Sequence, residues 1–332
     1  MYTSVIIPTR NRSFLLKKAI QSLTVQTYPS ENFEVIIVDN GSTDDTRSVV
    51  ESYQKVLPNL IYAYEPSPGL HVGRHKGLEL SRGEILVYAD DDIEAFPTWL
   101  EGISESFENP EVALVGGNNV PNYESPPPPW IEELWGNTPY GKANGMYSIL
   151  DFGNEVKEIA PEYVWGCNFS IRKNVLIEVG GFHPDAMPDG LLRYRGDGET
   201  AVSNKIRKTQ YIAIFNPKAS VYHFVSTRRM NLEYIRKRGY IQGISDSYRR
   251  IRESGKLSLK SCLKIYHSHI IFSIRKQLNT LLKGDISPYE IYRQGWWNGY
   301  KFHMSEVLKD NSMLEWIVQE DYFAENGTIR ML

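Results

Sequence analysis

The chain has 332 residues, a net charge of −3 and 41% apolar residues, values of an ordinary soluble globular protein that can bury a sizeable core. The near-neutral charge argues against nucleic-acid binding, and two cysteines exclude a disulfide framework and indicate a reducing cytoplasm. Neither a signal peptide nor a membrane-spanning run of ~20 apolar residues is predicted.

The first half of the chain alternates strand and helix patterns. Strand-like runs cover residues 5–7, 33–38, 60–64 and 85–89, and helical spacing follows each of the first three. The alternation predicts an α/β fold with a mostly parallel central sheet flanked by helices.

Two details of the predicted helices can be tested. Ser42 has the position of an N-cap for the second helix. Gly69, Gly73 and Gly77 recur every four residues, which favours a closely packed third helix over a dinucleotide-binding loop.

Three consecutive carboxylates, Asp90, Asp91 and Asp92, follow directly on the apolar run at 85–89. Like charges this close raise one another's pKa unless a cation lies among them. Their oxygens suit Mg²⁺ or Mn²⁺ shared with substrate phosphates. A metal site that holds a phosphorylated ligand is one interpretation, and an acidic turn that caps the next segment is the other.

Polar residues also follow the first strand, as Thr9 and Arg10, and the second, as Asp39 and Asn40. Open α/β sheets bind ligands beyond the carboxyl ends of their strands. Three strands thus bring polar groups to one edge, which favours a metal–nucleotide site. Because the chain has neither G-x-G-x-x-G nor G-x-x-x-x-G-K-[ST], a dehydrogenase or a P-loop nucleotidase is disfavoured.

The second half of the chain changes in character. The proline-rich segment 121–139 predicts an irregular surface loop, which is either a linker or a flap over the site. A strand at 165–171 and a short helix at 174–179 follow, and long helices are predicted at 232–252 and 257–282.

The composition suggests a first domain of residues 1–226 and a helical, partly basic extension of residues 227–332. Residues 228–283 contain 14 Lys or Arg and 3 Asp or Glu. Such a run is either a solvated helical surface or a surface that contacts anionic lipid at the inner face of a membrane. It lacks a recognised nucleic-acid-reading motif.

Several short motifs occur in an order that is specific as a set. They are Val5 to Arg12, Val35 to Asp44, Gly69 to Arg74, Gly83 to Asp92, Pro97 with Trp99 and Leu100, Gly166 to Phe169, Gly180 to Phe182, and Gly196 to Thr200. In these motifs the chain resembles the family 2 glycosyltransferases, enzymes of the Rossmann-like GT-A fold, over about residues 3–225.

The resemblance implies an inverting enzyme that uses a nucleoside diphosphate sugar, with UDP or dTDP preferred and GDP as the alternative. The positions that match donor-binding residues are Pro8, Thr9, Arg10, Asp39, Arg74, Asp90 and Asp91. The acidic trio matches the family's D-x-D element, so Asp92, with Asp90 and His223, is expected to hold Mg²⁺ or Mn²⁺. The metal would neutralise the charge that builds up on the departing diphosphate.

The resemblance also implies a base for the acceptor hydroxyl, which is too weak an acid to attack the anomeric carbon unaided. Glu199 registers at the base position and Asp197 is the alternative, although both could instead solvate a helix N-terminus. Trp165 and Asn168 match acceptor-side positions.

The expected partners are a glycan or lipid-linked acceptor and, through the basic extension, a membrane surface. Two other classes stay open. A sugar-phosphate nucleotidyltransferase would carry a Gly-rich N-terminal signature, which is absent, and a non-catalytic nucleotide-sugar-binding protein would have lost acidic residues that are intact here.

Overall fold

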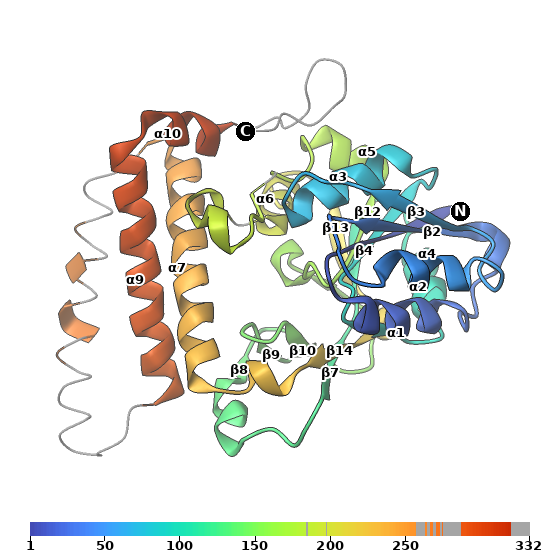
Figure 1. Ribbon diagram of the computed structural model, residues 1–332, viewed down its shortest axis with the longest axis horizontal. Helices are drawn as coiled ribbons and strands as arrows, with labels where there is room; N and C mark the ends of the chain where they lie inside the picture. The colour runs from blue at the N-terminus through green and yellow to red at the C-terminus, as the bar shows by residue number, and fades with distance from the viewer. Residues whose placement is uncertain are drawn as a thin grey trace.

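The computed structural model describes residues 1–183, 185–196, 198–256 and 287–319, with seven further positions between 263 and 274. Figure 1 shows an α/β body built around two sheets, with a group of long C-terminal helices standing beside it. Within the described ranges, no helix is both long and apolar enough to cross a membrane.

The large sheet has the strand order β11-β13-β6-β12-β4-β1-β2-β3. Its strands are β1 (Thr3–Thr9), β2 (Phe33–Asp39), β3 (Leu60–Tyr64), β4 (Ile85–Ala89), β6 (Val112–Gly116), β11 (Lys157–Ile159), β12 (Asn168–Arg172) and β13 (Ile212–Phe215). The four strands predicted in the first half run parallel, with Val5 opposite Val35 and Val87. Strand β12 is antiparallel to both of its neighbours, so the sheet is mixed.

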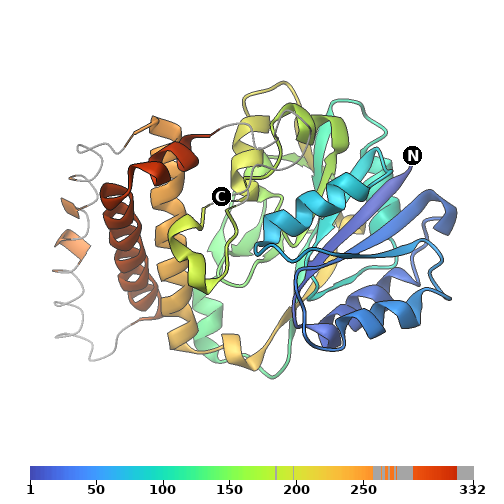
Figure 2. The same cartoon turned by 45° about the horizontal axis from the view of Figure 1, so that its top comes forward.

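Helices cover both faces of this sheet. One face carries α1 (Ser13–Leu23), α2 (Thr46–Tyr53) and α4 (Trp99–Ser106), and the other carries α3 (Leu70–Leu80), α5 (Lys173–Glu178) and α6 (Glu199–Ile206) (Figures 1 and 2). Successive side chains of β1 alternate between the two cores, because Val5 and Ile7 belong to one and Ile6 to the other. The predicted α/β architecture is confirmed.

Helix α3 lies close against β1 because of its glycines. A Cβ atom on Gly73 would lie 3.0 Å from Cβ of Pro8, and one on Gly77 would overlap the side chain of Ile6. The prediction that this glycine repeat belongs to a closely packed helix is confirmed.

The predicted N-cap of α2 is wrong. The helix begins at Thr46, whose N–H donates to Oδ1 of Asp44 at 3.1 Å. Ser42 instead accepts a hydrogen bond from the N–H of Asn11 at 2.9 Å. Its hydroxyl therefore ties the loop after β2 to the loop after β1.

The second sheet has the order β5-β14-β7-β10-β9-β8. Its strands are β5 (Ile93–Ala95), β7 (Asn119–Tyr123), β8 (Gly136–Asn137), β9 (Lys142–Asn144), β10 (Ile149–Asp151) and β14 (Val221–Val225). Strand β14 pairs with β5 antiparallel and with β7 parallel. Because β5 follows β4 after three residues, the turn between the two sheets consists of the acidic trio.

Short 3₁₀ turns connect these elements. They are η1 (Ser30–Asn32), η2 (Pro129–Leu134), η3 (Pro161–Tyr163), η4 (Asp189–Tyr194), η5 (Pro217–Ala219) and η6 (Thr227–Arg229). Turn η2 lies in the proline-rich segment and buries Ile131 completely, in a cluster with Tyr147 and Ile235. This buried centre favours an anchored loop over a flap.

The C-terminal helices are α7 (Leu232–Ser254), α9 (Pro288–Lys309) and α10 (Asn311–Val318). Helices α7 and α9 lie side by side in Figures 1 and 2. Their backbones touch through two glycines of each helix, where any Cβ atom would overlap backbone atoms of the other helix; these are Gly239, Gly243, Gly295 and Gly299. The predicted helix at 232–252 is confirmed, and most of the one predicted at 257–282 lies outside the described residues.

Candidate active site

The acidic trio lies where the two sheets meet. Asp90 follows the last residue of β4, and Asp92 precedes the first residue of β5. In the next pair of strands, Ile93 of β5 lies opposite His223 of β14. One oxygen each of Asp90 and Asp92 and a ring nitrogen of His223 lie within 4.8 Å of one another. The structure thus brings together the three residues expected to hold a metal.

Asp92 divides its two oxygens between different partners. Its Oδ2 accepts a hydrogen bond from Nη2 of Arg12 at 2.7 Å and lies 3.6 Å from Nη1 of Arg229. Its Oδ1 is buried 3.3 Å from Nε2 of His223 and has no hydrogen-bond partner among the described residues. A buried, unsatisfied carboxylate oxygen beside a second carboxylate and an imidazole fits a divalent cation.

Asp91 has different contacts. Its Oδ2 accepts a hydrogen bond from the hydroxyl of Thr9 at 2.7 Å, and its Oδ1 pairs with Nη1 of Arg12 at 2.6 Å. The guanidinium of Arg12 therefore bridges Asp91 and Asp92. Part of the positive charge that the trio requires is supplied by this arginine.

The three carboxyl groups differ in their pKa values. Burial raises the pKa of Asp90, and burial together with the neighbouring acids raises the pKa of Asp91 to about 7 against the effect of Arg12. Burial also opposes ionisation of Asp92, but His223, Arg12 and Arg229 outweigh it and hold its pKa below the ordinary value. Asp92 is therefore the member of the trio that is most firmly ionised.

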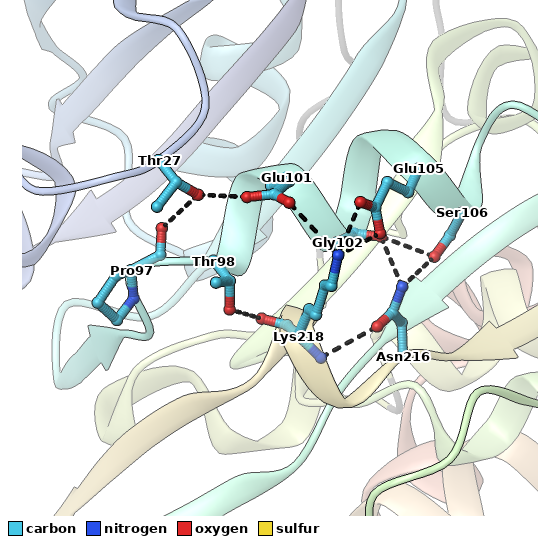
Figure 3. A network of polar contacts seen from close by, with 9 residues as sticks. All are labelled: Thr27, Pro97, Thr98, Glu101, Gly102, Glu105, Ser106, Asn216 and Lys218. Atoms are coloured by element: carbon cyan, nitrogen blue, oxygen red, sulfur yellow. Dashed lines mark hydrogen bonds and ion pairs between the residues drawn. The ribbon is translucent and has the colours of Figure 1, made fainter.

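A polar network fixes the connection that leads into β14 (Figure 3). Nζ of Lys218, in η5, donates to Glu105 of α4 at 2.8 Å. Nδ2 of Asn216 donates to a backbone carbonyl of the same helix at 2.9 Å. Anchoring on α4 thus helps to hold β14, and with it His223, beside the trio.

A pocket of about 300 Å³ opens beside the trio. Its lining residues are Pro8, Thr9, Arg10, Arg12, Asn40, Gly69, Leu70, Asp90, Asp91, Ala186, Met187, Pro188 and Arg195. Five of the seven expected donor-binding residues are among them. Arginines and apolar side chains share the lining, a combination that suits a ligand with a flat ring and phosphate groups.

Asp39 and Arg74, the other two expected donor residues, are not in this lining. Asp39 accepts a hydrogen bond from the N–H of Ser42 at 2.7 Å and one from the hydroxyl of Tyr62 at 2.8 Å. Burial and this bond raise the pKa of Tyr62 to about 12. Each oxygen of Asp39 keeps a further lone pair, so its contact with a donor stays a prediction.

Arg74 lies between the trio and the expected base. It is only 1% exposed, and its Nη2 donates to the carbonyl of Gly166 at 2.7 Å and lies 3.6 Å from Oδ1 of Asp90. Its Nη1 lies 3.5 Å from Oε2 of Glu199, the first residue of α6. One guanidinium thus holds Asp90 and Glu199 on two sides of the same site.

Glu199 is tightly enclosed on its inner side. A Cβ atom on Gly166 would lie 2.5 Å from Oε1 of Glu199. Nε2 of His71 lies 3.8 Å from Oε2, and burial and the charge of Arg74 hold the pKa of His71 well below its ordinary value. Asp197, the alternative base, lies outside the described residues.

The two expected acceptor residues lie in different surroundings. Trp165 is partly exposed and packs against both cores of the large sheet. Asn168 is buried, where its Oδ1 accepts from Nε1 of Trp99 and its Nδ2 donates to the carbonyl of Ala219, both at 2.9 Å. These are contacts of a structural amide. The acceptor roles of both residues stay predictions.

Sequence reasoning gave no role to Arg12, His71 or Arg229, although each contacts a carboxylate of the site. Arg12 belongs to the first motif, and His71 lies one helical turn before Arg74, so both carried a positional signal. Arg229 was counted only within the basic extension. Its contact with Asp92 depends on the path of the chain after β14, which no local pattern predicts.

Comparison with known proteins identifies the class of this fold and site. Residues 4–180 match the model of glycosyl transferase family 2. The chain belongs to this family and is a glycosyltransferase with the GT-A fold. The nucleotidyltransferase and non-catalytic alternatives are therefore not retained.

Individual relatives agree with this class. The chain is 27% identical over 254 residues to a glucosyl-dolichyl phosphate glucuronosyltransferase of Haloferax volcanii, which covers 74% of the chain and 76% of the relative. It is 36% identical over 110 residues to a GalNAc(5)-diNAcBac-PP-undecaprenol beta-1,3-glucosyltransferase of Campylobacter jejuni, covering 31% of the chain and 35% of that relative.

A solved structure shares the fold. A mannosyltransferase of Pyrobaculum calidifontis, in complex with GDP-mannose and Mn²⁺, aligns with a TM-score of 0.56 and 18% identity. The alignment covers 95% of the chain and 84% of that protein.

Proposed function

We propose that the chain transfers a sugar from a nucleoside diphosphate sugar to a hydroxyl group of a glycan or lipid-linked acceptor. The donor binds in the pocket beside the trio, with UDP or dTDP as the preferred nucleotide and GDP as the alternative. Transfer is a property of residues 1–226, and residues 227–332 form an extension that contributes Arg229 beside Asp92.

The observation that carries the proposal is the group formed by Asp90, Asp92 and His223, whose ligand atoms lie within 4.8 Å. It adjoins a pocket that Asp90 itself lines. We assign Mg²⁺ or Mn²⁺ to this group, and the imidazole favours Mn²⁺ as the softer of the two. When bound, the ion supplies charge neutralisation for a departing diphosphate.

Glu199 is proposed as the general base. Its ion pair with Arg74 supports this role, because Arg74 also contacts Asp90 and so ties the base to the donor side of the site. A single displacement with one base inverts the anomeric centre. Proton NMR of the product tests this step, and a product with the donor's own anomeric configuration would refute inversion.

A lipid-linked acceptor is proposed from the relatives. The names of the two described above specify a dolichyl phosphate and an undecaprenol diphosphate. Residues that would bind such an acceptor are proposed on the Trp165 side of the site, where the aromatic face could stack on a sugar.

The first experiment is a thermal-shift screen of UDP, dTDP and GDP, each with Mn²⁺, with Mg²⁺ and with a chelator. A ligand that binds only the folded state raises the midpoint of unfolding. We expect one nucleotide to raise it in the presence of metal and to have little effect with the chelator. Equal shifts with metal and with chelator would contradict the metal assignment, and no shift with any nucleotide would contradict the donor class.

A second assay tests the transfer itself. The full chain is incubated with a panel of UDP-, dTDP- and GDP-sugars in Mn²⁺, and the release of nucleoside diphosphate is measured with and without a soluble acceptor analogue. Release that depends on the acceptor supports transfer. Release of pyrophosphate instead would indicate nucleotidyl chemistry.

A further inference from the structure

Four exposed apolar side chains form a stripe on the segment between α7 and α9. Leu263, Ile270, Ile271 and Ile274 are helical and are 63%, 44%, 40% and 53% exposed. At 3.6 residues per turn these positions fall within an arc of about 100° on one side of a helix. Apolar residues gathered on one face in this way mark an interaction surface. We call these four residues the apolar stripe.

The other side of the same segment is in contact with α9. The ring of Phe272 lies 5.4 Å from the guanidinium of Arg293, and the ring of Tyr266 lies 5.7 Å from that of Trp297. In Figures 1 and 2 the helical pieces of this segment, in orange, lie on the side of α9 away from α7. The apolar stripe therefore faces away from the protein body.

The charge around the apolar stripe is one-sided. Residues 254–284 contain six Lys or Arg and no Asp or Glu. An amphipathic segment with an apolar stripe and exclusively positive charges suits the surface of an anionic bilayer. Association of two copies through this surface is disfavoured, because it would bring twelve positive charges together.

We propose that the apolar stripe docks the protein on an anionic lipid surface, with its side chains inserted at the boundary between headgroups and acyl chains. The basic residues of 254–284 supply the long-range attraction to the headgroups. Docking is a function separate from sugar transfer. It holds the enzyme on the surface in which a lipid-linked acceptor would reside.

The test is a vesicle flotation assay with the full chain, without sugar donor or acceptor. Vesicles of phosphatidylcholine alone are compared with vesicles containing phosphatidylglycerol, at low and at high salt. We expect binding to the anionic vesicles only, falling as the salt rises from 0.1 to 1 M because the screening length shrinks from about 10 to about 3 Å. A chain that stays unbound to anionic vesicles at low salt would overturn the proposal.

Paired variants identify the surface. Ile270→Glu with Ile274→Glu is expected to lower the vesicle partition coefficient at least about tenfold. Val25→Glu with Val56→Glu is the matched control, because these valines are 59% and 65% exposed on the catalytic body. It adds the same charge and should lower binding much less. Equal losses in both double variants would show that charge alone acts and would refute the apolar stripe.

Two further measurements keep the result interpretable. Circular dichroism and nucleotide-induced thermal shifts check that the Ile270→Glu, Ile274→Glu variant is folded. Light scattering reports its mass in solution. If the unmodified chain is a dimer that this variant dissociates, and neither binds vesicles, the stripe is an interface between copies and the proposal is wrong. Failure of transfer with normal vesicle binding would count against the proposed activity alone.

Discussion

Arg12 and Asp92 form an ion pair of 2.7 Å that uses only one oxygen of the carboxylate. Because Arg12 also pairs with Asp91 at 2.6 Å, one guanidinium offsets the charge of two members of the acidic trio. The other oxygen of Asp92 is left facing His223. Arg12 thus keeps the trio together and directs Asp92 toward the proposed cation.

Replacing Arg12 with alanine should destabilise the metal-free protein. Removing one partner of a fully buried pair costs about 3–5 kcal/mol, and the 41% exposure of the Arg12 side chain reduces the expected cost to about 1–3 kcal/mol. Added Mn²⁺ should raise the unfolding midpoint more in this variant than in the unmodified chain, since the ion replaces the lost charge. Differential scanning fluorimetry with and without Mn²⁺ measures both effects.

Arg10→Ala is the matched control for this experiment. Arg10 is exposed at the same pocket but forms no ion pair with the trio in the described part of the chain. Its removal should leave the metal-free midpoint nearly unchanged. If Mn²⁺ shifted both variants and the unmodified chain equally, the compensating role of Arg12 would be disproved.

Asp92→Asn should abolish the metal-dependent part of nucleotide binding, because it removes the buried charge that faces Asp90 and His223. We expect the Mn²⁺-dependent rise in the unfolding midpoint to disappear. Asp91→Asn should keep a metal-dependent rise, since both oxygens of Asp91 are used by Thr9 and Arg12. The reverse pattern would transfer the metal-binding role to Asp91.

Glu199→Gln should lower kcat by a factor of about 10²–10⁴ and leave donor affinity unchanged, because a neutral amide cannot accept the acceptor's proton. Steady-state kinetics and a donor titration measure the two quantities. Glu162→Gln is a matched control: Glu162 is 34% exposed and pairs with an arginine, and Glu199 is 33% exposed. Similar kcat values for Glu199→Gln and the unmodified enzyme would exclude Glu199 as the base.

Gly166→Ala should impair catalysis without abolishing folding. The added Cβ atom would lie 2.5 Å from Oε1 of Glu199 and 2.9 Å from Nη2 of Arg74, so both side chains would have to move. We expect kcat to fall about tenfold or more with unchanged donor binding. Gly145→Ala, where a Cβ atom meets nothing within 4 Å, should have full activity. Equal kcat in the two variants would mean that the position of Glu199 is unimportant.

Acid should weaken the contact between α7 and α9. Burial lowers the pKa of His303 to about 4, and its Nδ1 lies 2.9 Å from the hydroxyl of Ser247. In the unfolded chain the histidine pKa is near ~6.5. Between these values the unfolded chain binds more protons, so the free energy of unfolding is highest above pH 6.5 and falls as the pH drops toward 4.

The expected loss from His303 between pH 7 and pH 5 is about 2 kcal/mol. Burial also lowers the pKa of His75 to about 4 and that of His183 to about 3, with the same sign. His303→Gln removes one contribution, so its stability should depend less on pH by about that amount. Denaturant unfolding at several pH values measures the difference, and parallel pH profiles for the two proteins would contradict it.

The sequence alone determined the elements whose signal is local. The apolar run at 85–89, the acidic trio that ends it and the four-residue glycine spacing of α3 each depend on near neighbours along the chain, and strand and helix periods are visible at that range. The order of the motifs was enough to identify the family.

Only the tertiary structure decided which side chains surround the trio. His223 reaches Asp92 because β14 pairs with β5, and Arg229 follows from the turn after β14. Asn168, expected near an acceptor, is instead buried against Trp99 by the pairing of β12 within the large sheet. Strand pairing joins residues far apart in the chain, so its consequences for charge and burial appear only once the sheets have formed.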